Sequence, residues 1–265
     1  MAGDHAAPPS DGPPLRAPEN DGLWAELRGM TTARIGLRRT GASLATGPML
    51  DFQFAHGRAR DAVREPLDEG RLIAELAGLS DPVLTVSSAS EDRQRYLMRP
   101  DLGRRLAPGA EATLAPHKDG YDVVFVITAG LSARAVQAHA SPVIACLLPA
   151  LRADHWRVAP LVIVRYGRVA VGDAIATTLL AACVAVLIGE RPGLSAPNSM
   201  GAYLTWQPRA DTTDADRNCI SNIRPEGIGY NDAAFKLAHM LRAMRARRLS
   251  GVQLKDGSDR LLLDR

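Results

Sequence analysis

The stretch Asp122–Ile127 reads DVVFVI, a continuous run of apolar and mostly β-branched side chains. Such a run is typical of a strand that is covered on both faces of a parallel sheet. Two similar runs follow, Ala159–Val164 and Val184–Ile188, and the segments between the three runs, Ala133–Leu151 and Asp173–Ala181, have the composition of helices. This alternation of strand and helix predicts a parallel sheet with helices on both faces.

Further elements are expected on both sides of these three strands. Downstream, the pattern predicts a strand at Tyr203–Trp206 and an amphipathic helix at Asn231–Leu249. Upstream, it predicts helices at 47–64, 67–79 and about 90–100, and a short strand at 83–86. The fold class that we predict is therefore α/β: a Rossmann-like, mostly parallel sheet with flanking helices, preceded by a smaller helical N-terminal part.

Three regions are expected along the chain. Residues 1–22 (MAGDHAAPPSDGPPLRAPENDG) contain many prolines and glycines and no apolar run, so we interpret them as a flexible, Pro-rich tail and not as a secretory signal. Residues 23–116 are expected to form the mainly helical region, and residues 117–265 the Rossmann-like domain.

The composition excludes several classes of protein. Of the 265 residues 46% are hydrophobic and 23% are charged, which argues against a disordered or fibrous chain. A formal net charge of +3 gives no reason to expect nucleic-acid binding. The longest apolar stretch, Ala174–Ile188, is shorter than the ~20 residues of a membrane-spanning helix, so we expect no membrane association. Three scattered cysteines without a CxxC pair indicate thiols in the cytoplasm and no zinc site.

Three loops are expected at one edge of the sheet. They are Thr128–Ala133, Tyr166–Asp173 and Gly189–Leu194, and each combines glycine with a polar group near a helix start. Ligands of such sheets bind beyond the carboxyl ends of the strands, where glycine lets them approach the backbone. No loop contains GxGxxG or a Walker sequence, so the usual dinucleotide and triphosphate motifs are absent. Turn glycines without any ligand remain the alternative interpretation of each loop.

Two single residues are candidates for contact with a ligand. Glu190 follows a buried strand, where its carboxylate can accept a hydrogen bond from a hydroxyl or an amide, or can pair with Arg191. Cys219 lies in the polar segment 214–227, which we expect to be a fixed, hydrogen-bonded loop. A thiol there is a nucleophile only beside a histidine base, and a packing contact is the alternative. No catalytic triad, HExxH motif or other metal-ligand cluster occurs.

The most basic stretch lies upstream of the first long apolar run. It contains Arg93, Arg95, Arg99, Arg104 and Arg105. Such a stretch is either a solvated helix face or a docking surface for an acidic partner or a phosphate.

Several segments together resemble the small, or light, subunit of ethanolamine ammonia-lyase. They are DVVFVITAGLSARAVQ (122–137), GRVAVGD (167–173), LIGERPGL (187–194), YLTW (203–206) and TDADRNCISNIRPEGIGY (213–230). Three shorter segments, FQFAHGRARDAV (52–63), YLMRPDLGRRL (96–106) and SGVQLKD (250–256), agree with the same pattern. The resemblance covers about residues 30–256, and GERPGL followed by RNCISNIRPEG is highly specific.

The resemblance implies a function and a cofactor. Ethanolamine ammonia-lyase uses adenosylcobalamin, a cobalt cofactor, to convert ethanolamine to acetaldehyde and ammonia. Its large subunit is a TIM barrel that binds the substrate and carries the catalytic residues, and the cobalamin lies between the two subunits. The residues implied to contact the cofactor are Val169 in GRVAVGD, Glu190 in GERPGL and Cys219 in RNCIS. No catalytic residue is expected on this chain, residues 117–265 would be its cobalamin-binding domain, and a bacterial microcompartment is one implied location.

Two other functions are alternatives to this one. The first is a stand-alone nucleotide-binding α/β enzyme such as a dehydrogenase, against which the missing GxGxxG counts. The second is a non-catalytic scaffold protein whose arginine-rich face only holds a partner.

Overall fold

The computed structural model of the chain describes residues 21–258, so most of the expected tail, residues 1–20, lies outside the described residues. The chain divides into two compact units between Gln53 and Phe54, which is not one of the boundaries expected from the sequence. The first unit contains helix α1 (Asp21–Met30) and a short hairpin of strands β1 (Arg39–Thr40) and β2 (Ser43–Leu44). Helix α2 (Thr46–Arg64) begins there and continues into the second unit.

Within residues 54–258, six strands form one mixed sheet in the order β3-β5-β4-β6-β7-β8. Strands β3 (Val83–Ser87), β5 (Leu161–Arg165), β4 (Val123–Thr128) and β6 (Cys183–Gly189) are parallel. Strands β7 (Met200–Trp206) and β8 (Arg217–Ile223) continue the sheet in antiparallel pairing. The predicted α/β class, with a mostly parallel sheet and a helical N-terminal part, is confirmed, and the sheet is mixed instead of purely parallel.

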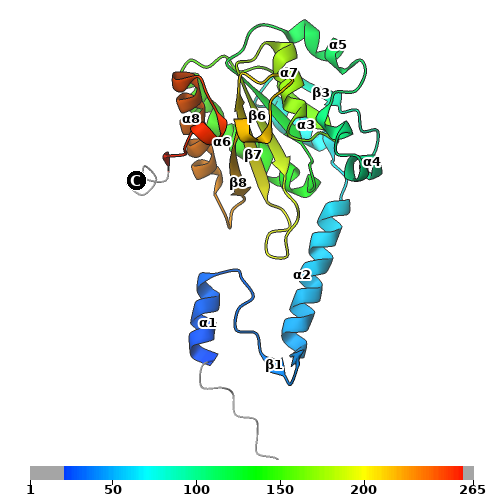
Figure 1. The fold of residues 1–265 in the computed structure, drawn as a ribbon, viewed down its shortest axis with the longest axis vertical. Coiled ribbons are helices and arrows are strands. Elements are labelled where there is room, and N and C mark those ends of the chain that lie inside the picture. Colours follow the sequence, from blue (N-terminus) through cyan, green and yellow to red (C-terminus); the bar gives the residue numbers. More distant parts are fainter. Residues whose placement is uncertain (1–20, 259–265) are drawn as a thin grey trace, which may run out of the picture. The chain divides into compact units, whose positions relative to one another are not determined.

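Helices cover both faces of this sheet (Figure 1). One face packs against α3 (Glu69–Ala77), α6 (Ala133–Ala153) and α8 (Tyr230–Arg247), and the other against α5 (Ala110–Leu114) and α7 (Val171–Leu179). All residues of β4 and β6 are buried because helices lie on both of their faces. The remaining short elements are α4 (Arg93–Met98) and the 3-10 turns η1 (Leu102–Arg104), η2 (Ala115–His117), η3 (Asp214–Asp216) and η4 (Gly251–Gln253).

The segment 214–227, which we expected to be a loop, contains strand β8, so that expectation is wrong. Arg217, Ile220 and Ile223 are buried, while the positions between them are exposed or half-buried. A bulge opposite β7, between Met200 and Ala202, breaks the simple alternation of inward and outward side chains. The strand is the last in the sheet, and its outward side chains are polar, which explains why the composition of the segment is typical of a loop.

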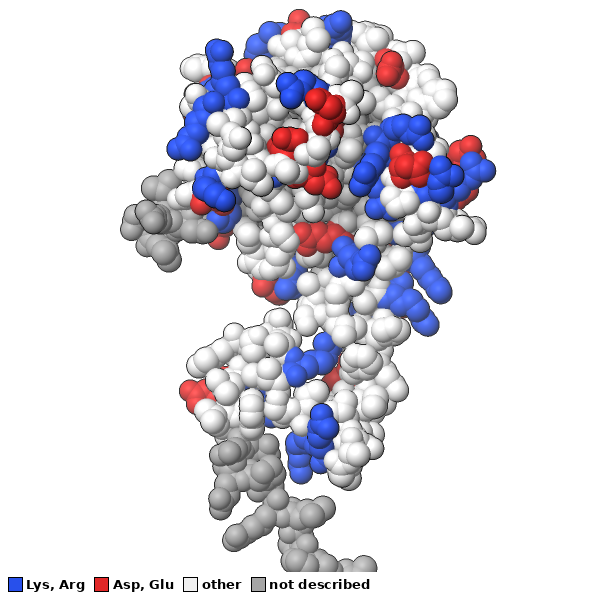
Figure 2. All heavy atoms as spheres, in the orientation of Figure 1, with Lys and Arg blue, Asp and Glu red and all other residues white. Residues whose placement is uncertain are grey.

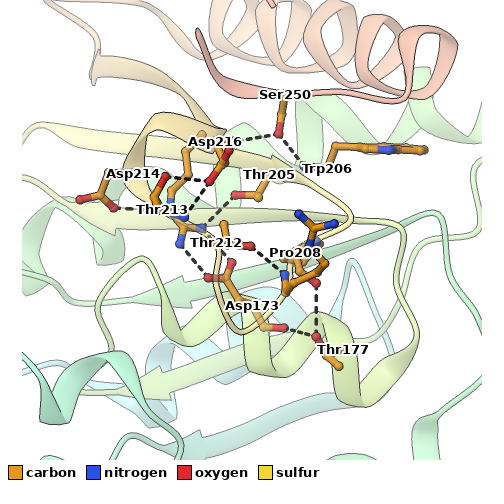
Figure 3. Close-up of polar contacts among 12 residues, drawn as sticks. Asp173, Thr177, Thr205, Trp206, Pro208, Thr212, Thr213, Asp214, Asp216 and Ser250 are labelled. Atoms are coloured by element: carbon orange, nitrogen blue, oxygen red, sulfur yellow. Dashed lines mark hydrogen bonds and ion pairs between the residues drawn. The ribbon is translucent and has the colours of Figure 1, made fainter. Parts of the chain in front are cut away.

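A buried ion pair ties β8 to helix α7. The Arg217 guanidinium donates to both carboxylate oxygens of Asp173, over 2.8 and 2.7 Å, and also to the hydroxyl of Thr205 over 3.0 Å. Figure 3 shows Asp173 at the start of α7 pointing toward the strand that carries Thr205. The Arg217 side chain is only 2% exposed, so its charge needs compensation within the protein, which comes mainly from Asp173 and in addition from the exposed carboxylate of Asp214, 3.5 Å from Nε.

The loop 190–199 between β6 and β7 is anchored by helix α6. Ser132, the N-cap of α6, donates its hydroxyl to the carbonyl of Pro197 over 3.3 Å. His139 lies 2.9 Å through Nε2 from the carbonyl of Asn198 and 2.9 Å through Nδ1 from the hydroxyl of Tyr230. A carbonyl only accepts, so Nε2 carries a proton, and in the neutral ring Nδ1 then accepts from the hydroxyl of Tyr230. Burial lowers the pKa of His139, although the hydrogen bond to the carbonyl of Asn198 acts in the opposite direction.

We predict that Asp173→Ala strongly destabilises the fold. The substitution leaves the Arg217 guanidinium buried without its main partner, which costs about 3–5 kcal/mol of unfolding free energy. The matched control is Asp119→Ala, which removes an exposed ion pair to Arg157 at 2.7 Å and should cost less than about 1 kcal/mol. Urea denaturation of both variants measures the difference, and equal losses would contradict a special role of the buried pair.

We also predict that His139 makes the fold sensitive to acid. Because its folded-state pKa lies below the value of about 6.5 in an unfolded chain, the unfolded chain takes up the proton first as the pH falls. Stability should therefore decrease from about pH 6.5 downward, and this slope should be smaller in His139→Gln. Ser132→Ala removes another anchor of the same loop without a titratable group, so it should lower the Tm at every pH and keep the slope. An unchanged slope in His139→Gln would contradict the assignment.

Candidate functional site

The three loops expected at one edge of the sheet meet there around a cavity of about 530 Å³. Leu131 comes from the loop after β4, Arg168, Val169 and Ala170 from the loop after β5, and Ile188 to Arg191 from the end of β6. The other lining residues are Tyr96, Arg104, Tyr203 and Asp214. Both signs of charge occur in this lining, and Figure 2 shows positive and negative side chains mixed over one face of the larger unit. The expectation that the loops share one edge is therefore confirmed.

Glu190 stands at the end of β6, and its carboxylate is held by neighbouring strands. The hydroxyl of Ser221 on β8 donates to Oε1 over 2.6 Å, and the hydroxyl of Ser199 donates to Oε2 over 2.5 Å. The backbone N–H of Asn222 lies 3.3 and 3.4 Å from the two oxygens. Of the two roles left open for Glu190, pairing with Arg191 is thus not the one seen, because serine and backbone donors hold the carboxylate.

Val169 lies in the loop between β5 and α7. Its side chain is half-buried and packs against the core between the sheet and α7, while also lining the cavity. Its carbonyl accepts from the N–H of Gly172 over 3.1 Å as the first turn of α7 begins. Gly172 is needed there because a Cβ would lie 2.6 Å from the side chain of Val186 on β6. The GRVAVGD segment therefore brings an apolar side chain to the cavity and lets α7 pack closely on the sheet.

Cys219 does not line the cavity directly. It lies on β8 opposite Tyr203, the lining residue on β7. Partial burial raises the pKa of the Cys219 thiol, and burial together with Cys219 raises the pKa of Tyr203 to about 12. A raised pKa keeps the thiol protonated near neutral pH, which argues against a nucleophile. Val169 and Glu190 thus line the same cavity, whereas Cys219 lies behind the lining residue Tyr203, with which it pairs across strands β7 and β8.

Two lining residues that the sequence analysis missed are Tyr96 and Arg168. The Arg168 guanidinium lies 4.4 Å from the centre of the Tyr96 ring and donates to the carbonyl of Tyr96 over 2.8 Å. Gly103 permits this contact, since a Cβ there would lie 3.0 Å from Cγ of Arg168. The sequence offers only the segments YLMRPDLG, with Tyr96, and YGRV, with Arg168. They lie far apart in the chain, so the contact between the two residues could not be predicted.

The five upstream arginines divide into different roles. Arg93 is an internal residue, because it donates to the carbonyls of Gly130, Leu131 and Val63 over 2.6–3.2 Å. Burial lowers the pKa of its guanidinium. The exposed members Arg95, Arg99 and Arg105 pair with Glu91 or Asp101, and Arg104 makes no ion pair with any residue in 21–258. Arg93 therefore belongs neither to a solvated helix face nor to a docking surface, and both interpretations stay open for the other four arginines.

The described part of the chain lacks the features of a metal site and of a membrane span. Residues 21–258 contain no group of three or more His, Cys, Asp or Glu side chains that could hold a metal ion. Over the same residues no helix combines the length and the apolar character that a membrane crossing requires. Cys146, Cys183 and Cys219 are free thiols.

Comparison with known proteins identifies the family. Residues 21–255 match the model of the family described as "Ethanolamine ammonia-lyase light chain (EutC)". The ethanolamine ammonia-lyase small subunit of Azotobacter vinelandii is 50% identical over 253 residues, which cover 94% of each chain. The small subunit of Ralstonia nicotianae is 49% identical over 245 residues, or 91% of each chain. With this similarity over its segments from α1 to η4, the chain belongs to the ethanolamine ammonia-lyase light-chain family and is a lyase subunit.

Proposed function

We propose that this chain binds adenosylcobalamin at the cavity beyond β4, β5 and β6, and that the large subunit covers the cofactor from the other side. The observation that carries the proposal is the meeting of the GRVAVGD and GERPGL segments, which bear the family resemblance, on one wall of that cavity. Val169, Glu190 and Cys219 are the proposed contacts with the cofactor. Ethanolamine would bind mainly to the large subunit.

The residues present fit a corrin with its polar edge. The corrin ring has an apolar face and a rim of amide side chains, and the lining offers apolar groups from Leu131, Val169 and Ile188 beside the carboxylate of Glu190. The Nε atom of Arg168 is buried and has no hydrogen-bond partner among the described residues, so a donor remains for an oxygen of the ligand. A cavity of about 530 Å³ suits a drug-sized ligand, so a cobalamin would be only partly enclosed. This supports a site that a second subunit completes.

The proposed role of this chain is binding and orientation. Adenosylcobalamin, when bound, supplies the radical by homolysis of its cobalt–carbon bond. Glu190 would accept hydrogen bonds from the amide rim, while Val169 would contact the ring and Cys219 and Tyr203 the neighbouring edge. Closing this side of the site keeps water away from the reacting groups. The raised pKa values of Cys219 and Tyr203 support a role without proton transfer by this chain.

The partner surface and the location of the protein stay predictions. The exposed arginines Arg95, Arg99, Arg104 and Arg105 are the part of the basic stretch that can still face the large subunit. Arg104 also lines the cavity, so a partner that covers the cofactor would pass over it. A cytoplasmic location, with a bacterial microcompartment as one setting, follows only from the family resemblance.

We predict that the isolated chain does not convert ethanolamine, whereas its complex with the large subunit does. The reason is that the lining supplies a binding wall and no catalytic base or nucleophile. Acetaldehyde formation is measured with adenosylcobalamin present, for each subunit alone and for the mixture. Turnover by the isolated chain would contradict the subunit role and favour a stand-alone enzyme, and assembly without any dependence on cobalamin would favour the scaffold.

Glu190→Ala should weaken cobalamin binding by the assembled enzyme. Hydrogen bonds to a charged acceptor contribute about 1.5–3 kcal/mol, which corresponds to a loss of roughly tenfold or more in affinity. The cobalamin Kd of the complex is measured by spectroscopic titration, with Asp211→Ala as the control because that exposed carboxylate lies outside the cavity lining. An unchanged Kd in Glu190→Ala would show that the assignment of Glu190 is wrong.

A further inference from the structure

We propose that Ser199 and Ser221 are positioning residues, which fix the carboxylate of Glu190 in the orientation that accepts a hydrogen bond from an N–H donor of the ligand. This inference rests on the proposed function, because it deepens the role of Glu190 in holding the amide rim of the cofactor. Neither serine lines the cavity, so both would act through Glu190.

The contacts come from three neighbouring strands. Glu190 directly follows β6, Ser199 directly precedes β7, and Ser221 lies within β8. The strand register makes this possible, since Gly189 pairs with Met200 and Met200 pairs with Ile223. Each serine hydroxyl takes a different carboxylate oxygen, at 2.6 Å for Ser221 and 2.5 Å for Ser199. A carboxylate that is held at both oxygens cannot rotate about its terminal bond without losing a donor.

The backbone restrains the carboxylate on a further side and leaves one acceptor position open. The N–H of Asn222 reaches both oxygens, and the hydrogen atom of Gly201 faces Oε1 closely enough that a Cβ would lie 2.9 Å from it. The N–H of Glu190 itself donates to the carbonyl of Ser199 over 3.0 Å, which fixes the backbone beneath the side chain. Orientation is therefore imposed by hydrogen bonds and by steric exclusion together.

The donors that hold Glu190 are neutral hydroxyl and backbone N–H groups, so its carboxylate keeps its negative charge. Two carboxylate oxygens offer about four acceptor positions, of which the two hydroxyls and the shared N–H take about three. No arginine or lysine within residues 21–258 forms an ion pair with Glu190, so its negative charge is not neutralised by a cation. The free acceptor position lies on a residue that lines the cavity. Such an acceptor recognises an N–H or O–H donor, and the amide rim of the proposed cofactor supplies N–H donors of this kind.

The first test removes the hydroxyls one at a time in the complete complex with the large subunit. Ser221→Ala and Ser199→Ala should each weaken cobalamin binding about three- to tenfold, because a mobile carboxylate must be ordered again on binding. The KM for the cofactor should rise while kcat changes little. Ser221→Thr keeps a hydroxyl and should restore the Kd to within about twofold of the original. Ser80→Ala is the control, since that serine hydrogen-bonds Pro82 and Leu161 away from the cavity.

The second test moves the carboxylate without removing a donor. Gly201→Ala places a methyl group against Oε1 and should also weaken cobalamin binding, whereas Gly193→Ala should not, because its nearest neighbour would lie 3.8 Å away. Urea denaturation of each variant separates a loss of binding from a loss of stability.

The outcomes separate this inference from the proposed function. If Glu190→Ala weakens cobalamin binding but the serine and Gly201 variants do not, the positioning role is wrong and the cofactor site stands. If the serine variants lose stability with no selective change in the Kd or KM for cobalamin, their role is structural and the inference is overturned. If Glu190→Ala leaves the Kd unchanged, the cofactor role of Glu190 and its positioning by the serines are both wrong.

Discussion

The buried ion pair between Arg217 and Asp173 is the interaction on which the geometry of the site depends. It joins the first turn of α7, which follows the Val169 loop, to the first residue of β8, which carries Cys219 and Ser221. Since β8 is the last strand of the sheet, its start is held by its inner neighbour β7, by this ion pair, and by hydrogen bonds from the Asn218 amide to the carbonyls of Gly251 and Leu254. The position of Ser221 beside Glu190 therefore depends in part on the contact between Arg217 and helix α7.

The cost of such a pair explains its surroundings. A buried arginine must recover the free energy of lost hydration, and it does so only with well-aligned donors and acceptors. Arg217 has two aligned bonds to Asp173 and a third to Thr205, so most of its donors are satisfied. Figure 3 shows two hydrogen bonds that hold the neighbouring turn. The hydroxyl of Thr213 donates to the carboxylate of Asp216, and the hydroxyl of Ser250, far along the chain, donates to the carbonyl of Asp216. This rigidity is what a site on an edge strand requires.

Much of the fold could be predicted from sequence because buried strands have a clear physical signature. The runs at β4, β5 and β6 are apolar throughout, as expected for strands between two layers of helix. Strand β8 could not be recognised in this way, because an edge strand with a polar outer face and a bulge has the composition of a loop. The antiparallel direction of β7 was equally hidden, since it depends on the path of the loop 190–199 between β6 and β7 and not on the residues of β7.

The site shows the same division between chemistry and geometry. Glu190 could be proposed from the sequence because it follows a buried strand, but its partners could not, since Ser221 lies 31 residues further along the chain. Arg93 was grouped with surface arginines for a similar reason. Its acceptors are the backbone carbonyls of Val63, Gly130 and Leu131, and every residue has such a carbonyl, so the residue types do not predict the contact. The family segments correspond to these contacts, with Asp173 in GRVAVGD pairing with Arg217 in RNCIS, and Glu190 in GERPGL bonding to Ser221. Segments that resemble a family so strongly thus include both residues that line the cavity and residues that hold the lining in place.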